Sequence, residues 1–274
     1  MITNRREMLA GRLIVLVAIA YTLVPLLSMF LAALHPQGTA PRGFEWPADP
    51  QWGNFRDAFN SANMAALLKS SLIIEAAVVP VSVLIATMAG FALGQLRVAG
   101  HKVIFVVMLL GLTMPFEVVI TPLYYRMRDL GLLDTRWAII LPLIALFMSF
   151  GVFWMRAHFL NLPDEFSEAA LVDGASTWQT FRYVHLPLAR PAMATLAILY
   201  FVWTWNQFIL ALVMVNDPER RTMAGALGYF QSQWGIDVVL LSAGSLVILT
   251  PTLIVFLIFQ RQFVAALLQG AIKG

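Results

Sequence analysis

The sequence contains no cysteine, so disulfide bonds, a thiolate nucleophile and a cysteine-ligated zinc site are excluded. Histidine is scarce as well: the four residues are scattered, and none forms an HExxH or similar metal-binding pair. Lysine is restricted to Lys69, Lys102 and Lys273, and none of them follows a glycine as in a Walker A loop. We therefore expect no metal site, no cofactor bound by this chain, and no ATP hydrolysis through that motif.

Charged residues are also rare. They make up 12% of the chain, whereas 60% is hydrophobic and the mean hydropathy is +0.78. A soluble domain has about 25% charged residues, and a soluble chain this apolar could not cover its core. The composition predicts an integral membrane protein surrounded by lipid. The net charge of +3 comes with no basic tail or patch, so nucleic acid is not an expected partner.

The sequence contains several long apolar runs. A helix needs about 20 mostly apolar residues to cross a bilayer, and none of the runs alternates as a strand does. The pattern predicts an all-α, polytopic fold with six transmembrane helices in one domain, residues 1–274. The spans are expected at about 13–34, 67–94, 103–122, 137–160, 191–215 and 237–261.

The start of the chain favours one orientation. The first apolar run follows Arg5, Arg6 and Arg12, and it is longer than the core of a signal peptide, which predicts an uncleaved anchor. Basic residues at this position favour a cytoplasmic N-terminus. Six spans then place the C-terminus and the loop 161–190 in the cytoplasm as well, with the chain in the cytoplasmic membrane.

Residues 162–191 form a polar stretch between two spans, LPDEFSEAALVDGASTWQTFRYVHLPLARP. A first helix is predicted after Pro163, where acidic residues meet the positive end of the helix dipole. Asp173-Gly174 predicts a turn, because Gly174 is free to adopt a positive φ. Ser176 followed by Gln179 predicts a capping box at the start of a second helix.

The second helix of this stretch is predicted to end at Leu186-Pro187, because the residue before a proline avoids helical backbone. Trp178 and Phe181 would share an exposed apolar face on it. The first helix is acidic, so anionic lipid would repel it. A protein partner with a groove for apolar anchors is therefore expected.

Three short motifs carry a resemblance to a known family. Glu168-Ala169-Ala170, Asp173-Gly174-Ala175 and Leu186-Pro187 resemble the EAA loop of binding-protein-dependent ABC importer permeases, and the similarity covers most of the chain from about residue 67. In that family the loop contains the coupling helix, which seats in a cleft of the ATPase subunit. One departure is His185, because a branched apolar residue is usual before Leu186.

The same loop and the later stretch WTWNQF resemble the carbohydrate-uptake subfamily, including maltose-type permeases, and are also similar to glycerol-phosphate permeases. The resemblance implies alternating access driven by a separate ABC ATPase dimer, which would bind ATP and Mg²⁺. It also implies a second, different permease subunit and an extracytoplasmic solute-binding protein. The residues it implies for coupling to the ATPase are Glu168, Ala169, Ala170, Asp173, Gly174, Ala175, Trp178, Phe181, Leu186 and Pro187.

Polar residues at membrane depth are costly and often functional. Glu117 lies between Pro115 and Pro122, where a broken helix would expose it to a cavity, although a structural role explains the pattern equally well. Glu75 is expected near the outer end of its span, where its side chain would reach the interface.

The stretch WTWNQF is expected mid-span in the fifth helix. Aromatic rings stack on sugar faces and amides bond hydroxyl groups, and Trp203 and Gln207 are four residues apart on one predicted helical face. Bonding between helices is the structural alternative for the amides. The candidate substrate path comprises Glu117, Trp203, Trp205, Asn206 and Gln207.

Three functions compete on these features. The first is the permease subunit of an ABC importer for a sugar or sugar-like polyol, which is not an enzyme. A glycerol-phosphate, glycerophosphodiester or amino-sugar importer is the alternative. A gradient-driven transporter would use Glu75 and Glu117 as proton carriers, but it leaves the helix pair at 162–190 unexplained.

Overall fold

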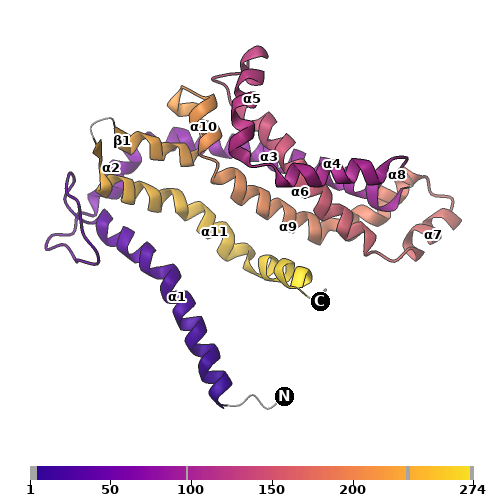
Figure 1. The fold of residues 1–274 in the computed structure, drawn as a ribbon, viewed down its shortest axis with the longest axis horizontal. Helices are drawn as coiled ribbons and strands as arrows, with labels where there is room; N and C mark the ends of the chain where they lie inside the picture. The colour runs from indigo at the N-terminus through magenta and orange to yellow at the C-terminus, as the bar shows by residue number, and fades with distance from the viewer. Residues whose placement is uncertain (1–4, 97, 233–234, 272–274) are drawn as a thin grey trace. The chain divides into compact units, whose positions relative to one another are not determined.

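The computed structural model describes residues 5–96, 98–232 and 235–271 (Figure 1). The chain divides into two compact units. The first unit comprises residues 1–65 and 226–251, and the second comprises residues 66–225 and 252–274. Helices form nearly all the regular structure in both. The prediction of an all-α fold is confirmed, and the described strands are limited to a pair of two residues each.

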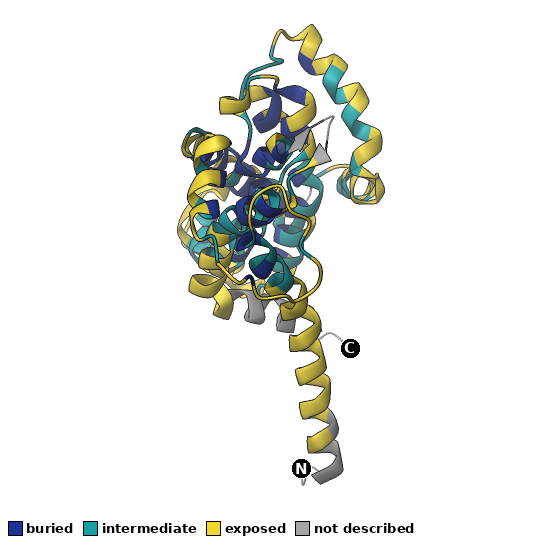
Figure 2. Cartoon of the chain, turned by 90° about the vertical axis from the view of Figure 1, so that its left-hand side faces the viewer, coloured by how far each residue is buried: buried dark blue, intermediate teal, exposed yellow. Residues whose placement is uncertain are grey.

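The first unit contains helices α1 (Arg5–Ala33) and α2 (Gly53–Ser61), strands β1 (Gln231–Ser232) and β2 (Gly235–Ile236), and the start of α11 (Val238–Ala271). Helix α1 is exposed along most of its length (Figure 2). The buried Asn54 amide ties α2 to the end of α1, donating to the carbonyl oxygens of Ala33 and His35 at 2.8 Å each. These bonds satisfy carbonyl groups that the end of a helix leaves without partners.

The second unit contains the remaining helices and both candidate sites. In chain order these are α3 (Met64–Gln95, which begins in the first unit), α4 (His101–Thr113), α5 (Phe116–Asp129), α6 (Trp137–Leu160), α7 (Glu165–Val172), α8 (Thr177–Thr180), the π-helical turn η1 (Phe181–His185), α9 (Leu186–Trp205), α10 (Ile209–Met214) and the 3₁₀ turns η2 (Pro218–Arg220) and η3 (Met223–Phe230), the last of which ends in the first unit.

Five described helices are long and apolar enough to cross a membrane, and a sixth span results if the bent pair α4–α5 counts as one. The predicted span 103–122 is wrong as a single helix, because α4 and α5 meet at 103°. Pro115 has no N–H group to donate, and Met114 before it has extended backbone angles, so the helix stops. Helix α5 then continues to Asp129, beyond the predicted end of the span at residue 122.

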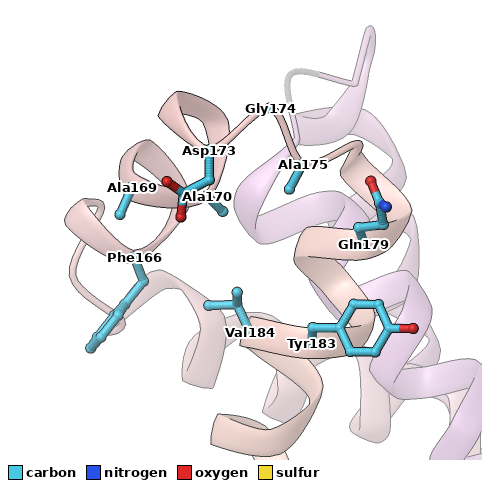
Figure 3. A pocket seen from close by; sticks show the side chains of 9 residues that line it. All are labelled: Phe166, Ala169, Ala170, Asp173, Gly174, Ala175, Gln179, Tyr183 and Val184. Atoms are coloured by element: carbon cyan, nitrogen blue, oxygen red, sulfur yellow. The ribbon is translucent and has the colours of Figure 1, made fainter.

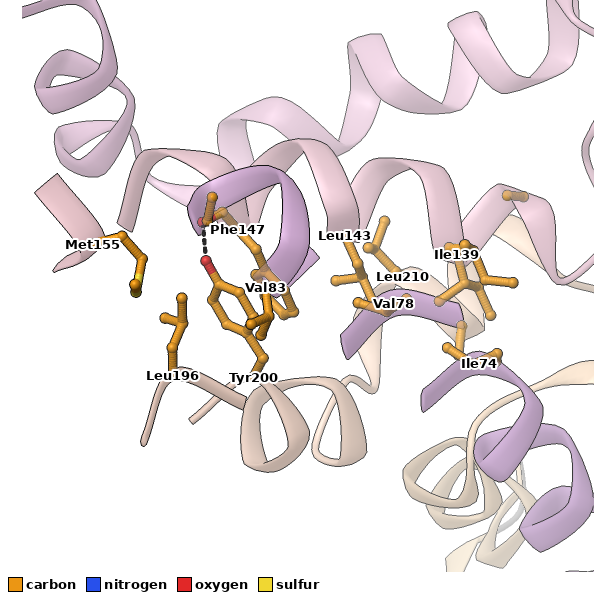
Figure 4. Close-up of a cluster of buried hydrophobic side chains, with 14 of the residues drawn as sticks. Ile74, Val78, Val83, Ile139, Leu143, Phe147, Met155, Leu196, Tyr200 and Leu210 are labelled. Carbon is orange, nitrogen blue, oxygen red and sulfur yellow. Dashed lines mark hydrogen bonds between the residues drawn. The ribbon is translucent and has the colours of Figure 1, made fainter. Parts of the chain in front are cut away.

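The core of the second unit lies between α3, α6 and α9 (Figure 4). Tyr200 on α9 stacks on Phe147 of α6, with ring centroids 4.6 Å apart, and its hydroxyl donates to the Phe147 carbonyl oxygen at 2.5 Å. Gly151 makes this bond possible, because a Cβ there would collide with the Tyr200 hydroxyl. The stack fixes the C-terminal part of α9 against the middle of α6.

Two glycines let α3 approach α6 closely. A Cβ at Gly90 would lie 2.6 Å from the Met155 Cβ and 2.8 Å from the Arg156 nitrogen, and one at Gly94 would lie 3.1 Å from the Phe159 Cβ. Small residues four apart allow such contact between membrane helices, where packing replaces the hydrophobic effect as the driving force.

Asp134 fastens the α5–α6 connection to the chain after α10. Its carboxylate accepts the N–H groups of Asn216 and Asp217 at 2.8 Å each, and its own N–H donates to the Met214 carbonyl oxygen at 3.0 Å. Chiefly because of the bond from Asp217, with help from Asn216 and the nearby Arg220, the pKa of Asp134 lies below its ordinary value. The contact holds α10 beside α5 and α6, which it touches.

The glycine contacts predict a graded loss of stability. Gly90→Ala is expected to lower the free energy of unfolding by about 1–3 kcal/mol, because rigid atoms of α6 leave no room for a methyl group. Gly94→Ala is expected to lower the free energy of unfolding by a smaller amount, because the nearest atom to its Cβ is farther away. Gly53→Ala is the control, because nothing lies within 4 Å of a Cβ there. Thermal unfolding in detergent measures the order, and a Gly90→Ala protein as stable as the control would refute the packing account.

Candidate functional site

The loop between α6 and α9 folds as a short helix, a tight turn and a second helix. Helix α7 ends in a Schellman motif: the Ala175 N–H donates to the Ala170 carbonyl at 2.9 Å, and the Gly174 N–H donates to the Leu171 carbonyl at 3.0 Å. Gly174 has a φ of +72°, as this motif requires. The predicted glycine turn is therefore confirmed, and it sets the angle between the two helices.

The second helix begins with the predicted capping box. The Gln179 N–H donates to Ser176 Oγ at 3.3 Å, and the Ser176 N–H donates to Gln179 Oε1 at 2.7 Å. These reciprocal bonds satisfy two donors at the start of α8, so a helix of only four residues has a defined first turn. Turn and cap together make the loop rigid over about ten residues.

A cavity of about 450 Å³ lies in the angle between the two helices (Figure 3). Side chains from both helices and from the turn surround it. Five residues of the expected coupling set line it, namely Ala169, Ala170, Asp173, Gly174 and Ala175, together with Phe166, Gln179, Tyr183 and Val184. The fold thus brings the EAA and DGA motifs to one concave surface.

The predicted stop at Leu186-Pro187 is wrong. The chain passes from α8 through the π-helical turn η1 into α9, and Pro187 occupies the first turn of α9. In η1 the Leu186 N–H donates to the Phe181 carbonyl, five residues back. This wider turn loosens the α-helical pattern where proline brings no donor, so the helix continues into the apolar segment.

The prediction that Trp178 and Phe181 share an exposed face is confirmed for Trp178 and wrong for Phe181. Trp178 is exposed, but Phe181 is buried and its ring centroid lies 4.9 Å from that of Phe91 on α3. Phe181 therefore anchors the loop to the core. Leu171 and Val172, at the end of α7, are 74% and 87% exposed instead. Their place beside the turn, at the end of a short helix, was the sequence signal for this apolar tip.

His185 fits its position through a hydrogen bond. Its ring is buried, and its Nε2 lies 2.9 Å from Ser167 Oγ on α7. Gln95, at the end of α3, contacts the same hydroxyl group at 3.2 Å. Neither Ser167 nor Gln95 belongs to the expected coupling set, and no pairing in the sequence indicated the contact.

Glu117 lies at the break between α4 and α5. It occupies the first turn of α5, where a carboxylate meets the positive end of the helix dipole, and its side chain is exposed. Helix α5 contacts α10, which begins after the second interruption of the unit, at residues 206–208. Discontinuous helices in transporters expose backbone groups and side chains to substrate.

The stretch WTWNQF forms that second interruption, so the predicted span 191–215 is not one helix. Because α9 ends at Trp205, Trp203 and Gln207 do not share a helical face as predicted. Trp205 is buried against Phe201, with ring centroids 5.7 Å apart. Asn206 is exposed and donates to the Val202 carbonyl oxygen at 2.8 Å.

The two other side chains of this stretch have mixed roles. Trp203 packs edge-on against Phe150, at 4.9 Å between ring centroids, and remains 40% exposed. Gln207 Oε1 accepts the Leu210 N–H at 3.3 Å and so caps α10. Of the candidate path residues, Glu117, Trp203 and Asn206 present exposed surface, whereas Trp205 is a core residue.

Glu75 does not reach the interface as expected. The residue is 6% exposed, and neither carboxylate oxygen has a hydrogen-bond partner among the described residues. An unpaired carboxyl group at this depth is costly to bury and marks a position of interest. Among the described residues, no group of three or more histidine, aspartate and glutamate side chains is arranged to hold a metal ion.

Comparison with known proteins adds a family match and close relatives. Residues 82–269 match the family described as the binding-protein-dependent transport system inner membrane component. The diacetylchitobiose uptake system permease protein NgcG of Streptomyces coelicolor is 33% identical over 92% of this chain and 84% of its own length. The trehalose transport system permease protein SugB of Mycobacterium tuberculosis is 33% identical over 93% and 94%.

Two further matches extend the comparison. The arabinooligosaccharides transport system permease protein AraQ of Halalkalibacterium halodurans is 34% identical over 91% of each chain. A solved chain from a bacterial ABC transporter involved in the import of the acidic polysaccharide alginate has a TM-score of 0.77 at 22% identity, covering 95% of this chain and 99% of its own. At that identity the likeness concerns the fold.

The helix breaks predict a substrate effect at Glu117. If the exposed carboxylate lines the substrate path, Glu117→Gln will change the KM for uptake severalfold and leave the amount of protein in the membrane unchanged. Glu45→Gln is the matched control, because Glu45 is exposed in the loop that precedes α2. Transport kinetics of the two variants in proteoliposomes measure the KM, and equal KM values for both variants would assign Glu117 a structural role.

Proposed function

The chain belongs to the family of binding-protein-dependent transport system inner membrane components, and from this premise we propose that it is the permease subunit of an ATP-driven sugar importer. The observation that carries the sugar assignment is the 33–34% identity, over more than nine-tenths of the chain, to permeases named for diacetylchitobiose, trehalose and arabinooligosaccharides. All three names specify saccharides, which favours a sugar over a glycerol phosphate and over the gradient-driven alternative.

The coupling role is supported by the surface of the α7–α8 loop. Leu171, Val172 and Trp178 are exposed apolar side chains on a rigid, polar-capped element, and such patches mark protein contacts. The concave surface beside them is lined by the EAA and DGA motifs. An ABC ATPase dimer, which binds ATP and Mg²⁺, would take hold of this loop, so that the permease performs transport and no hydrolysis of its own.

The transport step follows from the same geometry. Movement of the ATPase clefts would turn α7 and the helices attached to it, and a substrate path between the membrane helices would open to alternate sides of the membrane. The broken pair α4–α5 and the interruption at residues 206–208 would line the path, with Glu117, Trp203, Asn206 and Gln207 as contacts. Trp205, which is buried, would support the path from the core.

The remaining parts of the importer lie outside this chain. A solute-binding protein would deliver the sugar at the outer face, and a second, different permease would complete the pathway. The basic residues before the first span favour cytoplasmic N- and C-termini, and in that orientation the α7–α8 loop would lie on the ATPase side of the membrane.

The sugar assignment predicts ATP-dependent uptake. Proteoliposomes with the permease and its co-expressed partner subunits are expected to accumulate at least one of labelled trehalose, diacetylchitobiose or arabinotriose when ATP is enclosed and the binding protein is outside. Labelled glycerol-3-phosphate is the control substrate. Uptake of glycerol-3-phosphate alone, or uptake that follows an imposed proton gradient without ATP, would refute the proposal.

The glycine turn predicts uncoupling. At φ +72° a β-branched residue carries a backbone strain of roughly 1–2 kcal/mol, whereas asparagine tolerates this region. Gly174→Val is therefore expected to change the angle between α7 and α8, so that ATP hydrolysis continues while sugar uptake falls. Gly174→Asn is the matched control and is expected to retain both. Normal uptake by Gly174→Val would contradict the role of the turn, and open space around Gly174 excludes a simple clash.

A further inference from the structure

A continuous chain of hydrogen bonds connects four elements of the second unit. His185 Nε2 in η1 lies 2.9 Å from Ser167 Oγ on α7, and Ser167 Oγ lies 3.2 Å from Gln95 Oε1 at the end of α3. Gln95 Nε2 in turn lies 2.6 Å from the carbonyl oxygen of Phe159, in the last turn of α6. This series of hydrogen bonds therefore runs from η1 through α7 and α3 to α6.

The Phe159 carbonyl at the end of the series determines which group donates in each hydrogen bond. The Phe159 carbonyl only accepts, so the amide nitrogen of Gln95 must face it and the amide oxygen must face Ser167. Ser167 has one proton, which it donates to that oxygen, so His185 must donate through Nε2–H. The opposite nitrogen, His185 Nδ1, is then a bare acceptor, and it is buried without a partner among the described residues. A bare acceptor there is consistent with the neutral Nε2–H tautomer.

The histidine end of this series of hydrogen bonds is shielded from water, whereas Ser167 and Gln95 are half-buried. His185 is 1% exposed, and its ring centroid lies 5.0 Å from that of Phe91 and 6.0 Å from that of Phe159. Phe181 packs on the same Phe91 ring. In such an apolar environment a broken hydrogen bond leaves its donor and acceptor unsatisfied, which costs more than the bond contributes in water.

We propose that this hydrogen-bonded chain transmits the movement of α7 into the cytoplasmic ends of α3 and α6, with Ser167 as its central positioning residue. The inference rests on the proposed function, in which the ATPase moves α7. The exposed side of α7 presents Glu168 and Leu171 to the partner, whereas Ser167 faces the permease. Moving α7 away from α3 and η1 would break two part-buried bonds at once, so the ends of α3, α6 and α7 are expected to move as one body.

The absence of cysteine makes the rigid-body claim directly measurable. Spin labels at Glu165→Cys on α7 and Leu84→Cys on α3, both exposed positions, report the distance between the two helices. With the Ser167 hydroxyl present, the distance is expected to be narrow and equal in the nucleotide-free and the ATP–vanadate-trapped complex. In Ser167→Ala it is expected to broaden or to differ between the two states, and Ser167→Thr, which keeps the hydroxyl, is expected to restore it.

The same variants test whether the movement of α7 is transmitted to α3 and α6. Ser167→Ala removes two hydrogen bonds, each contributing about 1 kcal/mol, and is expected to raise the ATP hydrolysed per labelled trehalose transported at least about fivefold, with Ser167→Thr near the unmodified value. His185→Gln, which retains an N–H donor, and His185→Phe, which does not, repeat the comparison if the Ser167 variants fold poorly. If trehalose is not transported, diacetylchitobiose and arabinotriose replace it.

Three results would overturn the inference. One is a Ser167→Ala distance distribution identical to that of the unmodified protein in both states. The others are a failure of Ser167→Thr to restore the distance, and equal ATP use by His185→Gln and His185→Phe. Failure of the proposed function is seen separately, as the absence of ATP-driven sugar uptake by the unmodified complex. In that event the distance comparison in the permease alone still decides whether the chain holds α7 to α3.

Discussion

Backbone hydrogen bonding in an apolar environment is the constraint on which the rest of this structure depends. In lipid every N–H and carbonyl group needs a partner within the protein, so a spanning segment is helical unless something else satisfies those groups. Each departure from helix in the second unit is accordingly local and compensated. Pro115 separates α4 from α5, Gln207 caps α10 after the end of α9, and η1 replaces α-helical bonds before Pro187.

These departures coincide with the regions to which we assign function. The two helix interruptions bring exposed polar side chains, Glu117 and Asn206, to helix ends, while α5 and α10 remain in contact. The π-helical turn lies where the α7–α8 loop passes into α9. A wide turn tolerates proline and orients two neighbouring rings, those of Phe181 and His185, toward the core. The helix interruptions thus leave polar side chains exposed at helix ends beside the apolar segments.

The α7–α8 loop combines local rigidity with attachment to the core. A Schellman motif and a capping box define its shape with bonds inside the loop. Attachment comes from Phe181, packed on Phe91, and from Ser167, bonded to both His185 and Gln95. A loop built in this way leaves an apolar tip at Leu171 and Val172 free for a partner. Force applied at the tip would reach the spanning helices through the attached residues.

The sequence alone determined those features that depend on neighbours along the chain. Membrane insertion, the helix–turn–helix of the loop, the positive φ at Gly174 and the cap at Ser176 follow from composition and from spacings of five residues or fewer. Tertiary structure decided the rest: the burial of Phe181 and Glu75, the continuation of the helix through Pro187, and the bond between Ser167 and His185. The two burials and the Ser167–His185 bond depend on atoms from other elements, which set the cost of burying a side chain. The continuation through Pro187 depends on the π-helical turn before it, whose bonding pattern the residue types alone do not specify.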